Sequence, residues 1–438
     1  MDTKSIIPLT HVCRYWRKSI ASVPANWTLI SNFNKNLMAL SLERAKATSL
    51  IVHLDMDKGE AGFFDVLAPY VQNIDTLHAE GYTTIEKFRQ ALPKFPQSTP
   101  NLRSLSLSSD TYWDRSIDPF ESLTTNLRYL KLGNIPLYPS LLRLRSLKRF
   151  AYANHKFDLH LDTLLDFLEG NRMLEHVILG VSFREASLRS SRRQTAMGNR
   201  IQCLSIYCHY PMDGQAIISS IPLRRGAHLN ITLTSMDGRL NDILSGVSTT
   251  HLLNLPSPTF IKYRSHPRSI QLFGPNGRLA LNTISILGAS DVFTEFPLLP
   301  LAHVREFHLI HRMSGWGMTQ RAHEPLFFSQ PSFPALETLA INCEISVSSL
   351  LSVLFSNPSS SPSLKTLAFM DCDITKDFMK ELTQYASRRK ATAAAWLYKV
   401  VIVNSNGVFP SIASIRKLKE HVSVVDVKVG TELPRDLA

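Results

Sequence analysis

Two cysteines and a histidine, Cys203, Cys208 and His209, form the group in this sequence that most resembles a metal site. Thiolates and imidazoles are the usual ligands of Zn²⁺, and structural zinc sites take four of them in closely spaced pairs. No second pair follows at a suitable spacing here. Because isolated cysteines are normally small core residues, we expect a structural role for both and no bound metal.

The other residues with catalytic potential are also isolated. Asp55 and Asp57 alternate in HLDMDKG and could serve as paired carboxylates in acid–base catalysis, but the segment favours a strand edge or a loop. His155 and His160 are five residues apart, which does not place two ligands on one helix face. The sequence has no glycine-rich phosphate loop and no Gly-x-Ser-x-Gly motif. We therefore expect no catalytic residue, no cofactor and no enzymatic activity.

The composition is that of an ordinary globular protein with an excess of positive charge. Of 438 residues, 44% are hydrophobic and 19% charged, and the net charge is +12. The five cysteines are scattered and odd in number, which is typical of a reducing compartment. No run of 18 apolar residues and no signal-peptide pattern occurs, so we expect a cytoplasmic or nuclear protein without membrane contact. The positive charge is dispersed, and its densest stretch is Arg184–Arg200. Nucleic-acid binding therefore stays open as a less favoured alternative.

One short pattern, apolar-x-x-apolar-x-apolar, recurs along most of the chain. Successive copies begin 20–28 residues apart in the first half and 23–33 residues apart in the second. A period of roughly 20–29 residues is typical of leucine-rich repeats. The copies begin at Ile74, Leu102, Leu127, Leu147, Leu174, Ile201, Leu281, Val304, Leu336, Leu364, Leu397 and Val422.

Each copy predicts one strand, and the segment between two copies predicts a helix. The last two apolar positions of a copy are two residues apart and share one face of a strand. In HLDTLLDFLEG, the helix-face spacing is kept by Leu161, Leu164, Leu165 and Leu168. Because stacked units of this kind bury a continuous core, we expect an α/β fold. It is an irregular leucine-rich-repeat-like solenoid over residues 49–430, with a parallel sheet on one side and helices on the other. A tail, 431–438, follows.

The repeat is least regular between residues 207 and 280. There HLNITL predicts one strand, and SPTFIKYRSHPRSIQLFGPNG predicts no clear element. An Asn or Cys usually follows the last apolar position by three residues. It occurs cleanly only as Cys372, whereas Asn134 and Cys343 lie one residue early. The backbone groups of the other turns therefore need other hydrogen-bond partners.

The residues before the repeats predict a small helical segment, 1–48. The apolar stripe of its first helix comprises Leu9, Val12, Cys13, Trp16 and Ile20. Pro8 suits the first turn of that helix. Pro24 then breaks the chain, so that Trp27 returns to pack. Since the terminal repeats of a solenoid need a cap, a purely structural cap is one interpretation of this segment.

The segment LTHVCRYWRKSIASVPANWTLI also resembles the second half of an F-box. The residues that carry the resemblance are Leu9, Val12, Cys13, Arg14, Trp16, Arg17, Pro24 and Trp27. The stretches LSLERAKATSLIVHLDMD and SIRKLKEHVSVVDVKVGTELP are similar to F-box-like proteins of the type found in mushroom-forming fungi. Together with the repeats, the resemblance covers nearly the whole chain.

The resemblance implies a substrate receptor of a cullin–RING ubiquitin ligase, with no catalytic residue of its own. The F-box would bind a Skp-type adaptor, and the repeats would present a protein substrate whose identity the sequence does not specify. The adaptor-binding residues carried over from the motif are Pro8, Leu9, Val12, Cys13, Trp16, Pro24 and Trp27. The family's first helix opens with Leu-Pro and an acidic residue, and only Met1–Ile7 precede Pro8. We therefore expect a shortened adaptor-facing surface, through a truncated gene model or a product that docks abnormally. The main alternative is a ligase-independent protein-binding scaffold.

Overall fold

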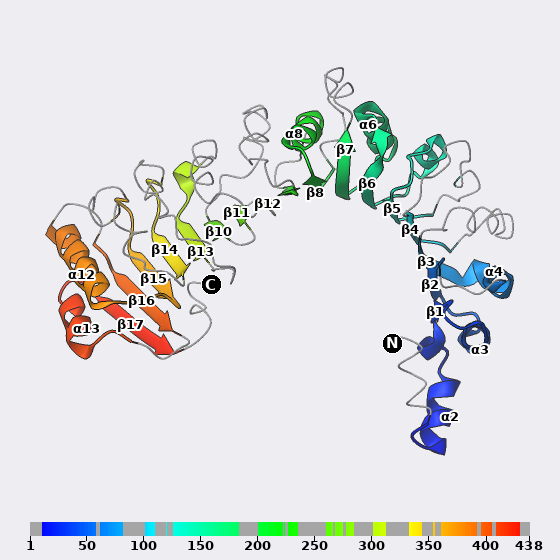
Figure 1. The fold of residues 1–438 in the computed structure, drawn as a ribbon, viewed down its shortest axis with the longest axis horizontal. Coiled ribbons are helices and arrows are strands. Elements are labelled where there is room, and N and C mark those ends of the chain that lie inside the picture. Colours follow the sequence, from blue (N-terminus) through cyan, green and yellow to red (C-terminus); the bar gives the residue numbers. More distant parts are fainter. Residues whose placement is uncertain are drawn as a thin grey trace. The chain divides into compact units, whose positions relative to one another are not determined.

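The computed structural model describes most of the repeats and divides the chain into two compact units. The first unit is Met1–Tyr207 with Ser220–Pro222, and the second is Cys208–Ser219 with Leu223–Ala438. Each has α/β architecture, in which mostly parallel strands carry helices on one side (Figure 1). The described residues are 11–57, 62–81, 101–109, 120, 126–183, 200–221, 223, 227–234, 260–265, 268–274, 277–283, 301–311, 333–343, 354, 361–391, 396–404 and 409–429.

The first unit is built on parallel strands that pair in chain order. They are β1 (Leu29–Ser31), β2 (Leu50–Asp55), β3 (Ile74–Gly81), β4 (Ser104–Ser109), β5 (Tyr129–Gly133), β6 (Arg149–Leu159) and β7 (His176–Phe183). The next strand, β8 (Cys203–Cys208), continues the series, because the N–H of Cys203 donates to the carbonyl of Glu175 at 3.1 Å.

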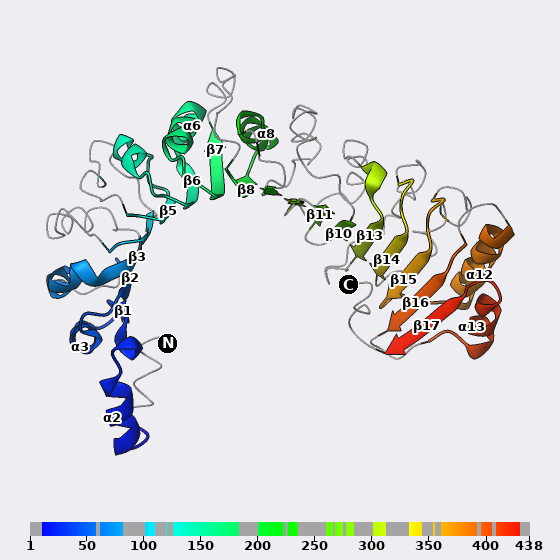
Figure 2. The ribbon, with the colours of Figure 1, turned by 180° about the vertical axis from the view of Figure 1, so that it is seen from behind.

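The helices of the first unit gather on one side of its sheet (Figure 2). They are α3 (Lys35–Ala45), α4 (Phe63–Leu67) and α6 (Leu161–Gly170), with the 3₁₀ turns η1 (Pro24–Trp27), η2 (Ala68–Asn73) and η4 (Pro139–Arg143). A further helix, α2 (Arg14–Ser22), precedes them. The ring of Phe150 on β6 lies 4.3 Å from that of Phe167 on α6, so the core lies between strands and helices.

The register of the strands follows the sequence repeat. Leu105 pairs with Leu130, which pairs with Phe150, which pairs with Val177. The following apolar position forms a second column, Leu107, Leu132, Tyr152 and Leu179, and both columns are buried. The predicted parallel strands of the repeat are therefore confirmed in this unit.

The backbone reinforces this register where the strands begin. The carbonyl of Arg103 accepts hydrogen bonds from the N–H groups of Arg128 and Tyr129 at 2.8 and 3.0 Å. The carbonyl of Arg128 accepts in the same way from Lys148 and Arg149, both at 2.9 Å. One carbonyl per strand thus ties the start of the next strand in place.

The second unit has the same parallel pairing over its last strands. They are β13 (Glu306–His311), β14 (Thr338–Cys343), β15 (Thr366–Met370), β16 (Lys399–Asn404) and β17 (Val424–Val429). Its helical elements are α8 (Pro211–Ser220), nearly all of which belongs to this unit, η8 (Leu301–His303), α12 (Lys376–Ala391) and α13 (Ile412–Lys419). The ring of Phe369 on β15 meets that of Phe378 on α12 at 5.1 Å, as in the first unit.

The stretch that the repeat leaves irregular forms an antiparallel meander. HLNITL is β9 (His228–Leu233), as predicted. It is followed by β10 (Phe260–Ser265), β11 (Arg268–Gly274) and β12 (Gly277–Thr283), which pair antiparallel to one another. Within the sheet β12 lies beside β9 and β10 beside β13, both in parallel. The expectation of a wholly parallel sheet is therefore wrong at β11.

The predicted helical head also contains a strand. Leu29–Ser31 pairs in parallel with β2, so this part of segment 1–48 is the first strand of the sheet. Asp55 ends β2 and Asp57 follows it, at the predicted strand edge. Several predictions fall outside the described residues: the basic stretch before Arg200, the loop around Trp316 and the tail 431–438. Among the described helices, none has the length and apolar composition to cross a membrane.

The side chains that hydrogen-bond the turns after the strands do not all stand three residues after the last apolar position. Cys372 is buried, and its Sγ donates to the carbonyls of Ile341 at 3.5 Å and Met370 at 3.3 Å. One asparagine, after β1, has a similar role. Asn32 is buried and bonds both backbone groups of Asp55, donating from Nδ2 at 2.8 Å and accepting at Oδ1 at 2.9 Å.

Arg389 is a fully buried cation in α12 that holds the chain just before β15. Its guanidinium donates to the carbonyls of Ser361 and Leu364 at 2.9 Å each and to that of Pro362 at 3.3 Å. It also donates to the hydroxyl of Tyr385 at 3.3 Å. Only the forked guanidinium supplies donors in these several directions at once.

We expect Arg389→Met to destabilise the protein by about 3 kcal/mol, because buried carbonyls lose their donors. Arg388→Met, which changes the exposed neighbour on the same helix, should shift stability by at most about 0.5 kcal/mol. Chemical denaturation of both variants and the parent measures the difference. Equal effects of the two substitutions would show that the buried hydrogen bonds contribute nothing specific.

Candidate functional site

The first described helix, α2, matches the predicted head helix but begins later. It starts at Arg14, with Cys13 as its N-cap, whose Sγ accepts from the N–H of Trp16 at 3.5 Å. Val12 therefore precedes the helix, although the sequence spacing predicts it within one continuous stripe. Pro8 and Leu9 lie outside the described residues.

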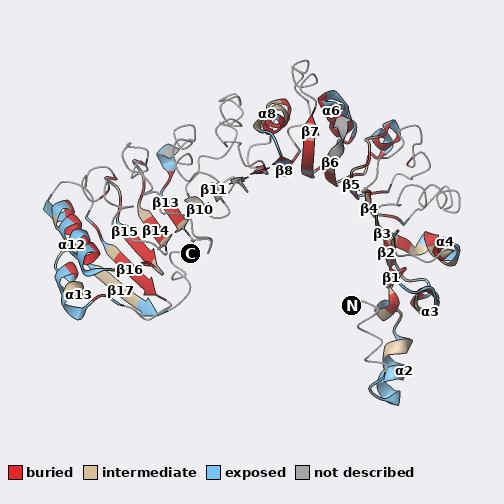
Figure 3. Ribbon diagram, viewed as in Figure 1, coloured by how far each residue is buried: buried red, intermediate tan, exposed pale blue. Residues whose placement is uncertain are grey.

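Helix α2 buries none of its residues, in spite of its apolar side chains (Figure 3). Val12 is 63% exposed and Trp16 is 49% exposed, and Tyr15 and Cys13 are exposed as well. Solvated aromatic and aliphatic side chains in one short segment are typical of an interaction site.

Trp27 fixes the end of this helix to the sheet. It is 1% exposed, and its Nε1 donates to the carbonyl of Ile20 at 3.2 Å. Asn26 donates to the same carbonyl at 3.2 Å. The guanidinium carbon of Arg44, on α3, lies 4.4 Å from the centre of the Trp27 ring. Trp27 is thus a core residue and Pro24 is half-buried, whereas Val12, Cys13 and Trp16 are solvent-accessible.

The second candidate surface is the face of the first unit's sheet that points away from the helices. We call it the open face; it carries the residues that alternate with the buried columns. One row across the strands is His78, Ser106, Lys131, Ala151 and Ile178. The next row toward the strand ends is Glu80, Ser108, Gly133, Ala153 and Gly180.

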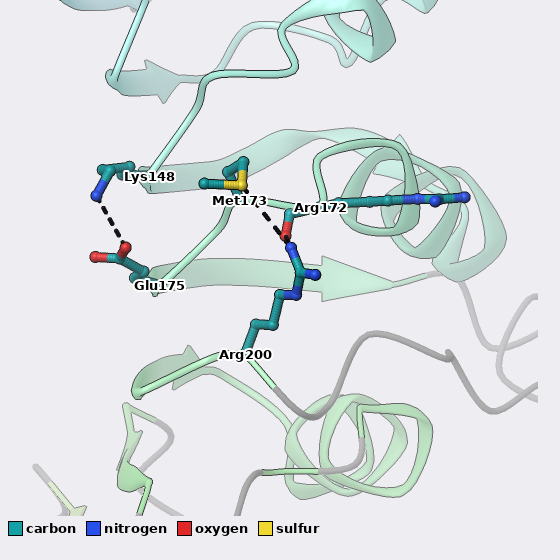
Figure 4. Close-up of polar contacts among 5 residues, drawn as sticks. All are labelled: Lys148, Arg172, Met173, Glu175 and Arg200. Atoms are coloured by element: carbon teal, nitrogen blue, oxygen red, sulfur yellow. Dashed lines mark hydrogen bonds and ion pairs between the residues drawn. The ribbon is translucent and has the colours of Figure 1, made fainter.

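The edge where these strands begin is charged. Lys148 and Glu175 form an ion pair of 3.0 Å between neighbouring strand starts, and Nη1 of Arg200 donates to the carbonyl of Arg172 at 3.0 Å (Figure 4). Lys365 and Glu337 take the equivalent places in the second unit at 3.5 Å. Such exposed pairs contribute little stability, so their main effect is on the charge that the edge presents.

Two histidines stand side by side at one end of the open face. His53 and His78 pair in register on β2 and β3, with ring centres 4.6 Å apart. Burial lowers the pKa of His78, and the neighbouring His53 and Lys131 lower it further, against the opposite effect of Glu80. Sequence reasoning missed this pair because the two residues lie far apart in the chain and become neighbours through the register.

The cysteines that most resembled a metal site are separated by the strand. Cys203 and Cys208 are five residues apart on β8, and an odd spacing turns two side chains to opposite faces. Burial, and then the charge of Asp213, raises the pKa of Cys208 to about 12, so its thiol stays protonated. In the described part of the chain, no three His, Cys, Asp or Glu side chains cluster as metal ligands would.

Comparisons with known proteins add little to this geometry. No protein-family model matches the chain, and no curated protein matches it. A solved structure that aligns with it is the crystal structure of a TLR13–ssRNA13 complex, at 14% identity and a TM-score of 0.35. The alignment covers 92% of this chain and 52% of that one, so this chain spans about half the length of the other. A score this low carries no argument about fold or function.

The two tryptophans of the head should differ sharply in their effect on stability. Trp27→Ala removes a buried aromatic and should cost about 3–5 kcal/mol. Trp16→Ala removes a side chain that is half in solvent, and the unfolding midpoint should hardly move. Denaturant titration of both variants measures this; comparable losses would mean that α2 is part of the core.

His78 should make stability depend on pH. A histidine whose pKa is lowered in the folded state binds fewer protons than it does unfolded, so stability falls as pH drops through and below its ordinary pKa of about 6.5. His78→Gln should therefore lose less stability than the parent between pH 7.5 and 5.5. His160→Gln, an exposed histidine before α6, serves as the control. Thermal unfolding across this range tests the prediction, and identical pH profiles for parent and His78→Gln would contradict it.

Proposed function

We propose that the protein is a non-catalytic substrate-recognition adaptor of a cullin–RING ubiquitin ligase. Its head, with Val12, Cys13 and Trp16, binds a Skp-type adaptor, and its leucine-rich-repeat-like sheet binds a protein substrate. It carries out no reaction itself. Its role is to hold a target near the ubiquitin-loaded enzyme at high effective concentration.

The observation that carries this proposal is the exposure of α2. An apolar helix that served only as a cap would pack against the first strands, yet every residue of α2 lies at least partly in solvent. At the same time Trp27 and Asn26 fix its C-terminal end through the carbonyl of Ile20. A fixed helix with free apolar side chains is a pre-organised docking element, which lowers the entropy lost on binding.

The repeats support the second half of the proposal. Strands that recur at the period of leucine-rich repeats stack in register, and each adds alternate residues to the open face. A surface of this kind suits recognition of an extended partner, because many strands contribute one contact each. The exposed charged edge at the strand starts widens the surface available to a partner.

Co-purification with a Skp-type adaptor tests the docking step. Trp16→Ala should weaken adaptor binding about thirtyfold, the usual effect of losing a central aromatic contact, and Val12→Asp should weaken it similarly. Lys18→Ala, an exposed residue of the same helix, should leave it unchanged. Isothermal titration with the purified adaptor gives the affinities.

A chimera guards this test against a false negative. An F-box first helix joined in front of Met1 supplies the adaptor-facing surface that the family uses, and it should strengthen adaptor binding. If neither the chain nor the chimera binds, the ligase role is rejected. The ligase-independent scaffold then remains, because the open face does not depend on the adaptor.

A further inference from the structure

We propose that the open face of β5–β8 binds an extended protein segment that combines acidic and apolar side chains. The inference names the class of substrate segment, and for its biological role it rests on the proposed function. The surface consists of Tyr129, Lys131, Arg149, Ile178, Gly180 and Tyr207, all in the first unit.

The apolar half of this surface lies on β7 and β8. Ile178 is 43% exposed and Tyr207 is 41% exposed, although both stand on a sheet whose alternate residues are fully buried. Beside them Gly180 has no side chain and is itself buried: a Cβ placed there would lie 3.8 Å from the Cβ of Tyr207 and 3.6 Å from that of Ala153. The small residues Gly180 and Ala153 thus lie beside two large, partly exposed apolar side chains.

The cationic half lies on β5 and β6. Lys131 and Arg149 are both exposed, and neither has a carboxylate partner among the described residues. Lys131 stands in the same row as Ile178, with Ala151 between them. Two strand spacings separate the two backbones, or about 9.5 Å. Because Ala151 has only a methyl group, no large side chain of β6 stands between Lys131 and Ile178 in this row.

The charge of the open face changes across the sheet, from one strand to the next. On β4–β8 the side chains that the structure describes on this face include Lys131 and Arg149 and no Asp or Glu. On β2 and β3 the same face carries Asp55 and Glu80, which pair in register. An acidic segment is therefore attracted to β5 and β6 and repelled from β2 and β3, which fixes where it binds.

This chemistry favours protein over nucleic acid. A phosphate backbone needs a succession of cations, but beyond Arg149 the surface offers Ala151, Ala153, Ile178 and Gly180. These groups match aliphatic or aromatic side chains. Three strand spacings from β5 to β8 are about 14 Å, so an extended segment of about five residues crosses the surface.

Fluorescence polarisation on the full chain, without any Skp-type adaptor, tests the proposal. The probes are labelled peptides of alternating Glu and Leu and of alternating Lys and Leu, and a labelled single-stranded oligonucleotide. The Glu–Leu peptide should bind at least tenfold more tightly than either of the others. The double variant Lys131→Glu, Arg149→Glu should reverse the order of the two peptides, and Ile178→Ser should weaken both severalfold.

Arg143→Glu is the matched control, because it reverses an exposed charge on η4, which lies on the helical side of the sheet. Its affinities should stay within twofold of the parent, and the unfolding midpoint of each variant verifies folding. Equal binding of both peptides, no binding of the Glu–Leu peptide, or tighter binding of the oligonucleotide would overturn the proposal. Failure of adaptor docking leaves this measurement untouched, so the two proposals fail separately.

Discussion

Hydrogen bonding between in-register parallel strands is the constraint on which the rest of the structure depends. Several parallel strands begin with two N–H groups that donate to a single carbonyl at the start of the strand before, as those of Arg128 and Tyr129 do to Arg103. The same arrangement recurs in the second unit, where Glu337 and Thr338 donate to the carbonyl of Arg305 at 2.7 and 2.9 Å. A strand that slipped by one residue would turn its leucines to solvent and its charges into the core. Register and burial therefore enforce one another, and the positions of all surface groups follow from them.

This coupling explains which features could be predicted from the sequence. The apolar-x-x-apolar-x-apolar pattern predicts the parallel strands β3–β8 and β13–β17, because core positions such as Leu339 and Leu367 pair directly. The helix around Leu164 follows from its spacing in the same way. Features that depend on a contact between distant segments have no local signal. In the sequence, Arg389 is one of several basic residues at the end of a helix. Its burial depends on the positions of the Ser361 and Leu364 carbonyls, which the local sequence does not indicate.

The candidate site also combines features that have a local sequence signal with features that depend on contacts between distant segments. Residue types alone mark the head, since two tryptophans and a cysteine in a short segment are unusual. The different environments of the two tryptophans come from three-dimensional packing: Trp27 meets Arg44, while Trp16 finds no cover that buries it. The open face carries even less signal, because Lys131 and Ile178 are 47 residues apart and share a row only through two successive strand pairings. The neighbours of a surface residue in the sheet come from other strands, so they are far from it in the sequence.

The meander of β10, β11 and β12 shows how a parallel sheet accommodates an insertion. It contributes three strands, and an odd number restores the direction of the chain, so β12 runs with β9 and β10 runs with β13. An insertion of two strands would leave one neighbour facing the wrong polarity and break the parallel hydrogen-bond pattern there. An insertion into such a parallel sheet must therefore contribute an odd number of antiparallel strands. The strands that flank the meander, β9 and β13, already run in the same direction. They therefore have the polarity needed to pair with each other if the meander is removed.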